Sequence, residues 1–200
     1  MRSDIGQNTS LVDHHCHGVM PEDLTSEQFE DAISEAFAPA PPGTTHWDKP
    51  VAISIRRWCA PLLDLEKFAA PDDYVARRRE LGAEEVNKRF MRAAGFEMLL
   101  IDSGNRPEEL CSVAEAGALA DVQSREIVRM ESIAERIVEA GGLTATSYAN
   151  AFEEGLRDSL HNNVVGLKTV LAYRATLNID YAPPKPEEVE SLGPGEIGFI

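Results

Sequence analysis

Short apolar runs that stop at polar or turn-forming residues predict four β-strands in this chain. Leu11 to Gly18 begins with two aliphatic residues and is stopped by its glycine. Phe96 to Asp102 is a nearly continuous apolar run with the length of a buried strand. Arg125 to Met130 is a third strand, although helical sequence follows it closely, and Asn163 to Lys168 is the fourth.

Sequence with helical character separates these strands. Thr25 and Gln28 have the spacing of a capping box, in which each side chain bonds the other residue's backbone at a helix start. A second helix is predicted at Val51–Leu63, and Pro61 is expected to kink or end it, because proline cannot continue the helical hydrogen bonding. The remaining predicted helices are Asp72–Ala94, Pro107–Ala120, Ser132–Ala140, Tyr148–Leu160 and Pro186–Leu192.

Strands that alternate with helices predict an α/β fold whose strands pair in parallel through right-handed crossovers. The 200 residues fit one domain with a sizeable core. The first crossover, residues 18–95, is much longer than the others, so we expect a helical insertion that forms a lid or wall over a site.

The charge and composition exclude several classes of function. A net charge of -15 repels phosphate backbones and anionic headgroups, which argues against nucleic-acid and membrane-surface roles. No apolar run approaches the length of a membrane span, and no secretory signal is recognisable, so a cytoplasmic location is expected. The odd number of widely spaced cysteines fits a reducing compartment, and Cys59 and Cys111 are expected to be inert thiols.

The first strand ends in a cluster of histidines that predicts a metal site. Three of the five histidines fall within four positions, and His15 and His17 leave the same face because they are two apart on a strand. Asp13 faces the same way, while His14 and Cys16 face the opposite side and form the alternative ligand pair. Neutral imidazoles bind divalent metals well. The alternative interpretation is a buried histidine pair satisfied by backbone hydrogen bonds.

The motif Asp13-x-His15-x-His17 resembles the first-strand motif of the amidohydrolase superfamily, metal-dependent hydrolases built on a (β/α)₈ barrel. Three later segments are similar to strands two to four of its branch that is fused to glutamine-synthetase-like domains in some fungal and plant proteins: Leu100–Gly104, Arg129–Glu131 and Val164–Arg174. The resemblance implies a TIM-type barrel, a divalent metal that is most often zinc, and water attack on a C–N or related bond of a small-molecule substrate.

Lys168 is the catalytic residue that this resemblance implies, since a carbamylated lysine at the end of strand four bridges two metals in binuclear members. The alternative is a structural or substrate-facing lysine paired with a carboxylate such as Glu131. Tyr173 and Arg174, just past the strand, are candidates for binding a substrate carboxylate through a bidentate guanidinium. They could equally cap a loop.

Other polar residues receive weaker assignments. Asp102 and Glu131 end the second and third strands and are expected to ring the same cavity. His46 lies in a loop rich in proline and glycine, where we expect it to be exposed, and Trp47 beside it could line a pocket. His161 is expected to cap the end of a helix.

The superfamily pattern also requires ligands that follow strand four, and the chain has no histidine after His161. A complete barrel takes roughly 250 residues, so we expect the chain to be the N-terminal half of one. Three hypotheses follow. The chain is part of a metal-dependent hydrolase, or a non-catalytic half-barrel that dimerises or complements another chain, or a different metal-binding α/β hydrolase that uses His46 or Asp102.

Overall fold

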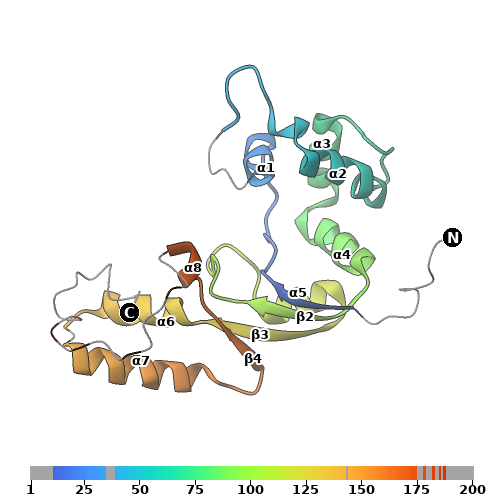
Figure 1. Ribbon diagram of the computed structural model, residues 1–200. Coiled ribbons are helices and arrows are strands. Elements are labelled where there is room, and N and C mark those ends of the chain that lie inside the picture. Colours follow the sequence, from blue (N-terminus) through green and yellow to red (C-terminus); the bar gives the residue numbers. More distant parts are fainter. Residues whose placement is uncertain are drawn as a thin grey trace.

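The computed structural model describes residues 11–34, 39–142 and 144–174, together with positions 178, 182, 185 and 187. Within them, four strands form one sheet in the order β1-β2-β3-β4, and every neighbouring pair is parallel. The sheet curls into half a barrel with helices between its strands (Figure 1), which confirms the predicted α/β fold of four βα units. The strands are β1 (Leu11–Cys16), β2 (Phe96–Asp102), β3 (Gln123–Arg129) and β4 (Val164–Lys168).

The helices differ from the predicted ones mainly at their boundaries. Gly82 interrupts the predicted helix Asp72–Ala94 with a φ of 80°, a conformation that glycine adopts without strain. The helix predicted from Pro107 begins only at Val113, because Ser112 and Glu115 form a capping box there. The described helices are α1 (Ser26–Ala32), η1 (His46–Asp48), α2 (Pro50–Trp58), η2 (Ala60–Leu63), α3 (Pro71–Leu81), α4 (Ala83–Ala94), α5 (Val113–Ala120), α6 (Met130–Ala140), α7 (Ala145–Ser159) and α8 (Leu171–Arg174).

The predicted capping box of Thr25 and Gln28 is present at the start of α1. The helix predicted at Pro186–Leu192 lies outside the described residues, apart from position 187. No helix in the described part of the chain is long and apolar enough to cross a bilayer.

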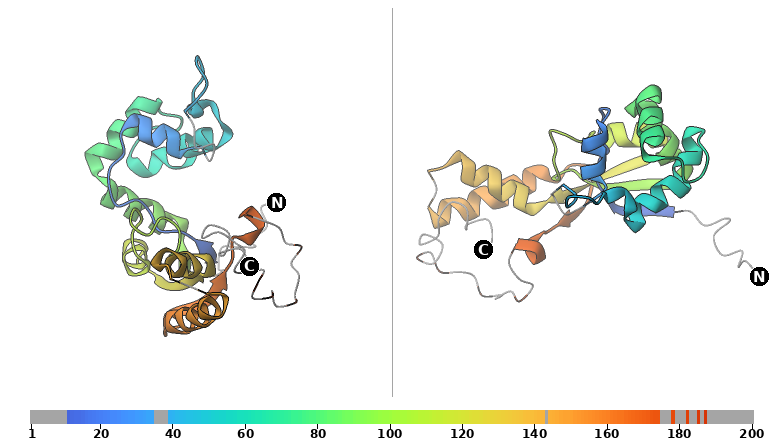
Figure 2. Two further views of the ribbon diagram at one scale, coloured as in Figure 1. Left: turned by 90° about the vertical axis from the view of Figure 1, so that its left-hand side faces the viewer. Right: turned by 90° about the horizontal axis from the view of Figure 1, so that it is seen from above.

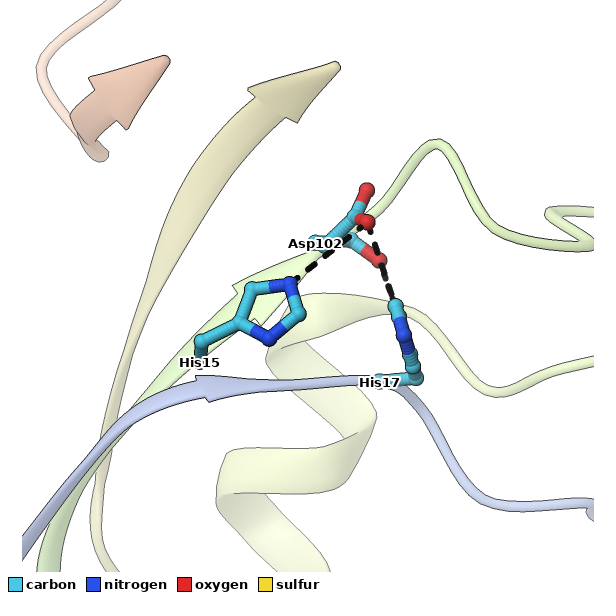
Figure 3. A group of neighbouring side chains, drawn as sticks. All are labelled: His15, His17 and Asp102. Atoms are coloured by element: carbon cyan, nitrogen blue, oxygen red, sulfur yellow. Dashed lines mark hydrogen bonds and ion pairs between the residues drawn. The ribbon is translucent and has the colours of Figure 1, made fainter. Parts of the chain in front are cut away.

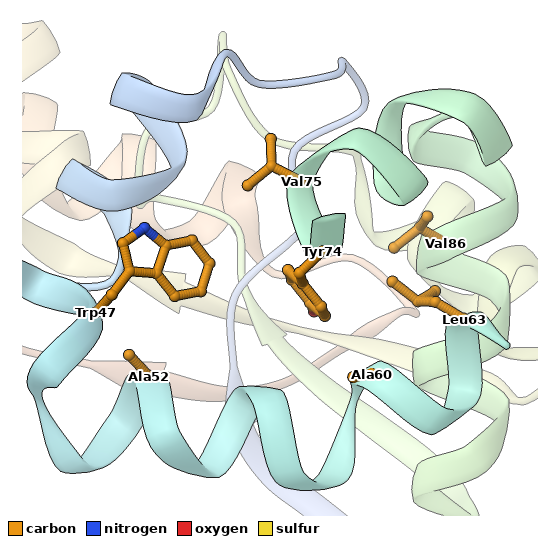
Figure 4. Close-up of a cluster of buried hydrophobic side chains, with 7 residues drawn as sticks. All are labelled: Trp47, Ala52, Ala60, Leu63, Tyr74, Val75 and Val86. Carbon is orange, nitrogen blue, oxygen red and sulfur yellow. The ribbon is translucent and has the colours of Figure 1, made fainter. Parts of the chain in front are cut away.

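The helices between β1 and β2 form a body with its own hydrophobic core (Figure 4). Trp47 and Tyr74 are buried at its centre, and Phe29 from α1 stacks on Trp47 with ring centroids 5.4 Å apart. The predictions for this loop were therefore wrong in two respects. His46 is 4% exposed rather than solvent-exposed, and Trp47 packs in a core instead of lining a pocket.

A second core lies between the sheet and helix α5. Leu99 and Ile101 from β2 pack against two alanines of α5, and Cys16 from β1 joins them. This confirms that Cys16 points toward the helical layer, so His15 points toward the other face. Figure 2 shows α6 and α7 side by side, at the end of the molecule away from α1–α3.

Candidate metal centre

His15, His17 and Asp102 come together where β1 and β2 end (Figure 3). The two strands are parallel, and Cys16 pairs with Ile101, so their carboxyl ends are level. One donor atom from each of the three side chains lies within 4.8 Å of the others. Asp102 Oδ2 is 3.8 Å from His15 Nε2 and 3.7 Å from His17 Nδ1. The predicted pair of histidines thus gains a carboxylate from the next strand.

The side chain of Asp102 has no exposed surface and is held in place by hydrogen bonds. Gly104 donates its backbone N–H to Oδ1 at 3.0 Å, and Arg129 donates to Oδ2 at 2.6 Å. Burial alone would raise the pKa of this carboxyl, but the hydrogen bonds and charges of Arg129 and Lys168 outweigh it and hold the pKa below its ordinary value. Asp102 is therefore an anion, which is the form that binds a cation.

Two cations from the adjoining strands converge on this carboxylate. Arg129 ends β3 and Lys168 ends β4, and the two residues are paired in the sheet register. Lys168 Nζ lies 3.0 Å from Asp102 Oδ2 and 2.6 Å from His15 Nε2. Lys168 thus faces Asp102 and His15, and the carboxylate it pairs with is Asp102 rather than Glu131.

The surroundings of His15 favour its neutral form. Burial lowers the pKa of the imidazole, and the positive charge of Lys168 and the proximity of His17 lower it further, against the opposite effect of Asp102. The two imidazole rings meet edge to face with centroids 5.3 Å apart, and each keeps about a third of its side chain exposed. Both rings are therefore accessible from solvent, as ligands at an open site must be.

The donor set fits a divalent transition metal. Two imidazole nitrogens and one carboxylate oxygen form one of the three-ligand sets that hold catalytic zinc and leave a position open. Asp13, which also faces the site side of β1, accepts the backbone N–H of His15 at 3.2 Å and thereby steadies the strand end. The chemistry of the residues present is thus compatible with a resident metal.

The candidates outside this cluster are placed less centrally. Glu131 is buried in the first turn of α6, where its Oε1 accepts hydrogen bonds from Thr169 and from the backbone N–H of Val170, the latter at 2.8 Å. It therefore fixes the turn after β4. Tyr173 is 88% exposed on α8, and the side chain of Arg174 lies outside the described residues.

Two other histidines do not join the centre. His46 belongs to the core region of the helical segment between β1 and β2. The ring of His161 lies 3.0 Å from Glu126 of β3 and accepts the backbone N–H of Asn163 at 3.3 Å, so its ring does not cap the preceding helix. Of the two ligands considered for the different metal-binding hydrolase, only Asp102 lies beside His15.

Arg129 is a residue of this site that the sequence pattern does not single out. It lies in the segment that resembles a third strand, and that resemblance implies no role for its side chain. Its position was nonetheless readable, because a residue that ends a parallel strand lies at the same edge as the ends of the neighbouring strands.

The chain matches no protein-family model, and a search of curated proteins gives no match. Among solved structures, it is similar to a candidate metal-dependent hydrolase from Lactobacillus casei ATCC 334, with a TM-score of 0.65 and 22% sequence identity. The alignment covers 94% of this chain and 49% of that one. The chain thus spans about half the length of the protein it matches, and the likeness shows a shared fold.

Proposed function

We propose that this chain belongs to a divalent-metal-dependent hydrolase of the amidohydrolase type, in which His15, His17 and Asp102 bind the metal. The observation that carries the proposal is the convergence of three ligand atoms within 4.8 Å at the carboxyl ends of parallel strands. In α/β barrels this is the edge that carries the chemistry. The neighbouring structure, described as a candidate metal-dependent hydrolase, supports the same class.

The metal we propose is zinc, because two imidazoles and a carboxylate suit it. When bound, it would act as a Lewis acid and lower the pKa of a water molecule for attack on a C–N or related bond. Asp102 would serve as a ligand rather than as a general base, since Arg129 and Lys168 hold its pKa low.

Lys168 remains a proposed catalytic residue, but as a charged ammonium group rather than as the carbamylated metal ligand that the resemblance implies. Its ammonium group lies at the edge of the proposed centre. Once a bound metal has displaced it from His15 and Asp102, its positive charge would stabilise the negative charge that develops on a substrate carbonyl oxygen. For a small-molecule substrate, Glu131, Tyr173 and Arg174 remain proposed contacts. The segment 18–95 remains a proposed insertion that covers the site.

Zinc binding by purified protein tests the metal assignment. Isothermal titration with Zn²⁺, together with elemental analysis, should give a bound metal in the wild-type chain and a strong loss of affinity in His15→Ala and His17→Ala. His14→Ala is the matched control, because it removes a histidine of the same strand that lies outside the cluster. Equal zinc binding by all four proteins would refute the assignment.

Hydrolysis is tested separately from binding. The zinc-loaded and the chelator-treated protein should be compared on a panel of small amides, cyclic amides and esters. Amide cleavage that needs zinc and is lost in His17→Ala would support the amidohydrolase type. Metal binding without cleavage of any panel member would leave the metal site in place and count against the hydrolase.

A second candidate function is a half-barrel that pairs with another copy or another chain. β1 and β4 are the outer strands of the sheet, and aliphatic residues on both are about half exposed, Val12 and Val165 among them. Unpaired strand edges with apolar side chains favour association. Light scattering on the purified chain tests this candidate: a stable dimer supports it, whereas a monomer with one cooperative melt contradicts it.

A further inference from the structure

Lys168 contacts two of the three proposed metal ligands through the atoms a metal would use. Its Nζ lies 2.6 Å from His15 Nε2 and 3.0 Å from Asp102 Oδ2. Both are donor atoms of residues in the candidate metal cluster. The ammonium group therefore lies where a cation shared by His15 and Asp102 would lie.

The Lys168 ammonium group and a metal ion cannot bind His15 Nε2 at the same time. Lysine has three N–H donors and no acceptor, so a hydrogen bond with His15 uses the lone pair of a neutral imidazole nitrogen. A metal ligand uses the same lone pair. Nζ and a metal therefore cannot both occupy Nε2, and a divalent cation would also be repelled by an ammonium group at contact distance.

Arg129 provides a natural comparison. It carries the same charge and donates to the same oxygen, Asp102 Oδ2, at 2.6 Å. Neither histidine is among the hydrogen-bond and ion-pair partners of Arg129 in the described part of the chain. Arg129 thus anchors the carboxylate from one side, whereas Lys168 spans the carboxylate and His15.

The side chain of Lys168 can also move away from His15 and Asp102. It is 20% exposed, and a flexible four-carbon stem can carry the ammonium group to solvent. By moving away, Lys168 would give up its hydrogen bond to His15 and its ion pair with Asp102, whereas the Asp102 carboxylate would keep Gly104 and Arg129 as partners.

We propose that Lys168 is an internal counter-cation that competes with the metal: it holds His15 and Asp102 together in the metal-free protein and must be displaced when a metal binds. The proposal rests on the proposed metal site. In it, Lys168 opposes metal binding, whereas a ligand would favour it. Removal of the ammonium group should therefore strengthen metal binding, whereas removal of a ligand would weaken it.

The test is the Zn²⁺ affinity of wild type, Lys168→Met and Arg129→Met, measured by competition with a chromophoric chelator in buffer depleted of carbon dioxide. Lys168→Met should bind zinc at least about tenfold more tightly than wild type, because the mutation removes both a repulsive charge and the occupant of Nε2. Arg129→Met should show a smaller gain, since it removes only the charge. Lys168→Gln gives the same comparison if the methionine variant does not fold.

Three outcomes would overturn the proposal. The first is weaker zinc binding by Lys168→Met and Lys168→Gln, with bicarbonate strengthening the binding of wild type, which would make a carbamylated Lys168 a ligand and leave the proposed metal site standing. The second is equal affinity in wild type and both lysine variants. The third is absence of zinc binding in every protein, which would refute the metal site as well. Zinc binding only in the lysine variants would support the competition in its strongest form.

A measurement without metal provides a second readout. Because Lys168 bridges His15 and Asp102, Lys168→Met should melt at a lower temperature than wild type in the presence of a chelator. Saturating Zn²⁺ should narrow or reverse that difference, since tighter binding to the folded state adds stability. A melt of Lys168→Met that stays equally far below wild type with and without Zn²⁺ would contradict the competition.

Discussion

The substitution Asp102→Asn should be one of the most destabilising single changes in this protein. Asp102 has no exposed side-chain surface, and two cations, Arg129 and Lys168, donate to its Oδ2. An asparagine keeps the volume of the side chain but removes the charge. It would therefore leave two positive groups facing each other without their counterion.

The magnitude follows from the burial of the partners. Removing one partner of a buried ion pair costs about 3–5 kcal/mol because the other charge is left uncompensated. Arg129 and Lys168 retain 12% and 20% exposure and can recover part of their hydration, so we expect the lower end, about 3 kcal/mol. In a chain of this size, each kcal/mol shifts Tm by roughly 2–4 °C, so Tm should fall by roughly 6–12 °C.

The assay is thermal and chemical denaturation of the metal-free protein at neutral pH. Asp13→Asn is the matched control. It removes a carboxylate from the same strand-end region that accepts the backbone N–H of His15, and it should change stability by less than about 1 kcal/mol. The double variant Asp102→Asn with Arg129→Met should recover part of the lost stability. A Tm for Asp102→Asn within 2 °C of wild type would refute the reasoning, since roughly 2–4 °C corresponds to only 1 kcal/mol.

Three further predictions concern other parts of the chain. Tyr74→Ala should cost about 3–5 kcal/mol, because Tyr74 is 1% exposed in the core of the helical segment, and denaturant unfolding followed by near-ultraviolet circular dichroism will measure it. The hydrogen bond from Thr45 lowers the pKa of Glu30, so the ionised carboxylate stabilises the fold above its unfolded pKa of about 4.3, and this stabilisation is lost as the pH falls through the lower folded pKa. Glu30→Gln should therefore make the free energy of unfolding less dependent on pH in this acidic range, which acid unfolding curves will measure. Gly104→Ala would place a Cβ 2.6 Å from the Cβ of Arg129, so the free energy of unfolding should fall by about 1–3 kcal/mol, which a lowered Tm will show.

The metal centre could be predicted from the sequence only where it depends on local geometry. The shared face of His15 and His17 follows from the two-residue period of a strand, and the structure confirms that Cys16 lies on the other side. The position of Asp102 also follows once the strands are parallel, because their carboxyl ends share an edge. Neither inference needs the detailed packing.

The contact between Lys168 and Asp102 depends on register, which the sequence does not reveal. β3 and β4 shift register between Glu126 and Ile127, and only beyond this irregularity does Arg129 stand opposite Lys168. The hydrophobic pattern of so short a strand does not specify such a shift. The end of the third strand was also misplaced: β3 ends at Arg129, so Glu131 lies in the first turn of α6 instead of at a strand end, and its Oε1 accepts the backbone N–H of Val170.

The interior of the helical segment was misread for a different reason. His46 and Trp47 lie among proline, glycine and threonine, a composition that predicts an exposed loop. Glu30 accepts hydrogen bonds from Thr45 at 2.5 Å and from the backbone N–H of His46 at 2.8 Å, and Trp47 stacks on Phe29. These contacts join residues about 15 to 18 positions apart, beyond the reach of local pattern.

The presence of two separate hydrophobic cores has a consequence for how the molecule unfolds. One core surrounds Trp47 and Tyr74 and the other lies between β2 and α5, and helix α4 joins them, since Val86 belongs to the first core and Met91 packs against the second. Each core can therefore open as a separate unit, with α4 at the boundary between them. Amide hydrogen exchange should then divide the chain into two cooperative units with different opening free energies. The backbone N–H of Cys111 donates a hydrogen bond to the carbonyl oxygen of Val19. This bond fixes the segment that follows β1 to the segment between β2 and α5. Opening of the helical unit would therefore begin beyond Val19 and leave the proposed ligands on the unit that stays folded.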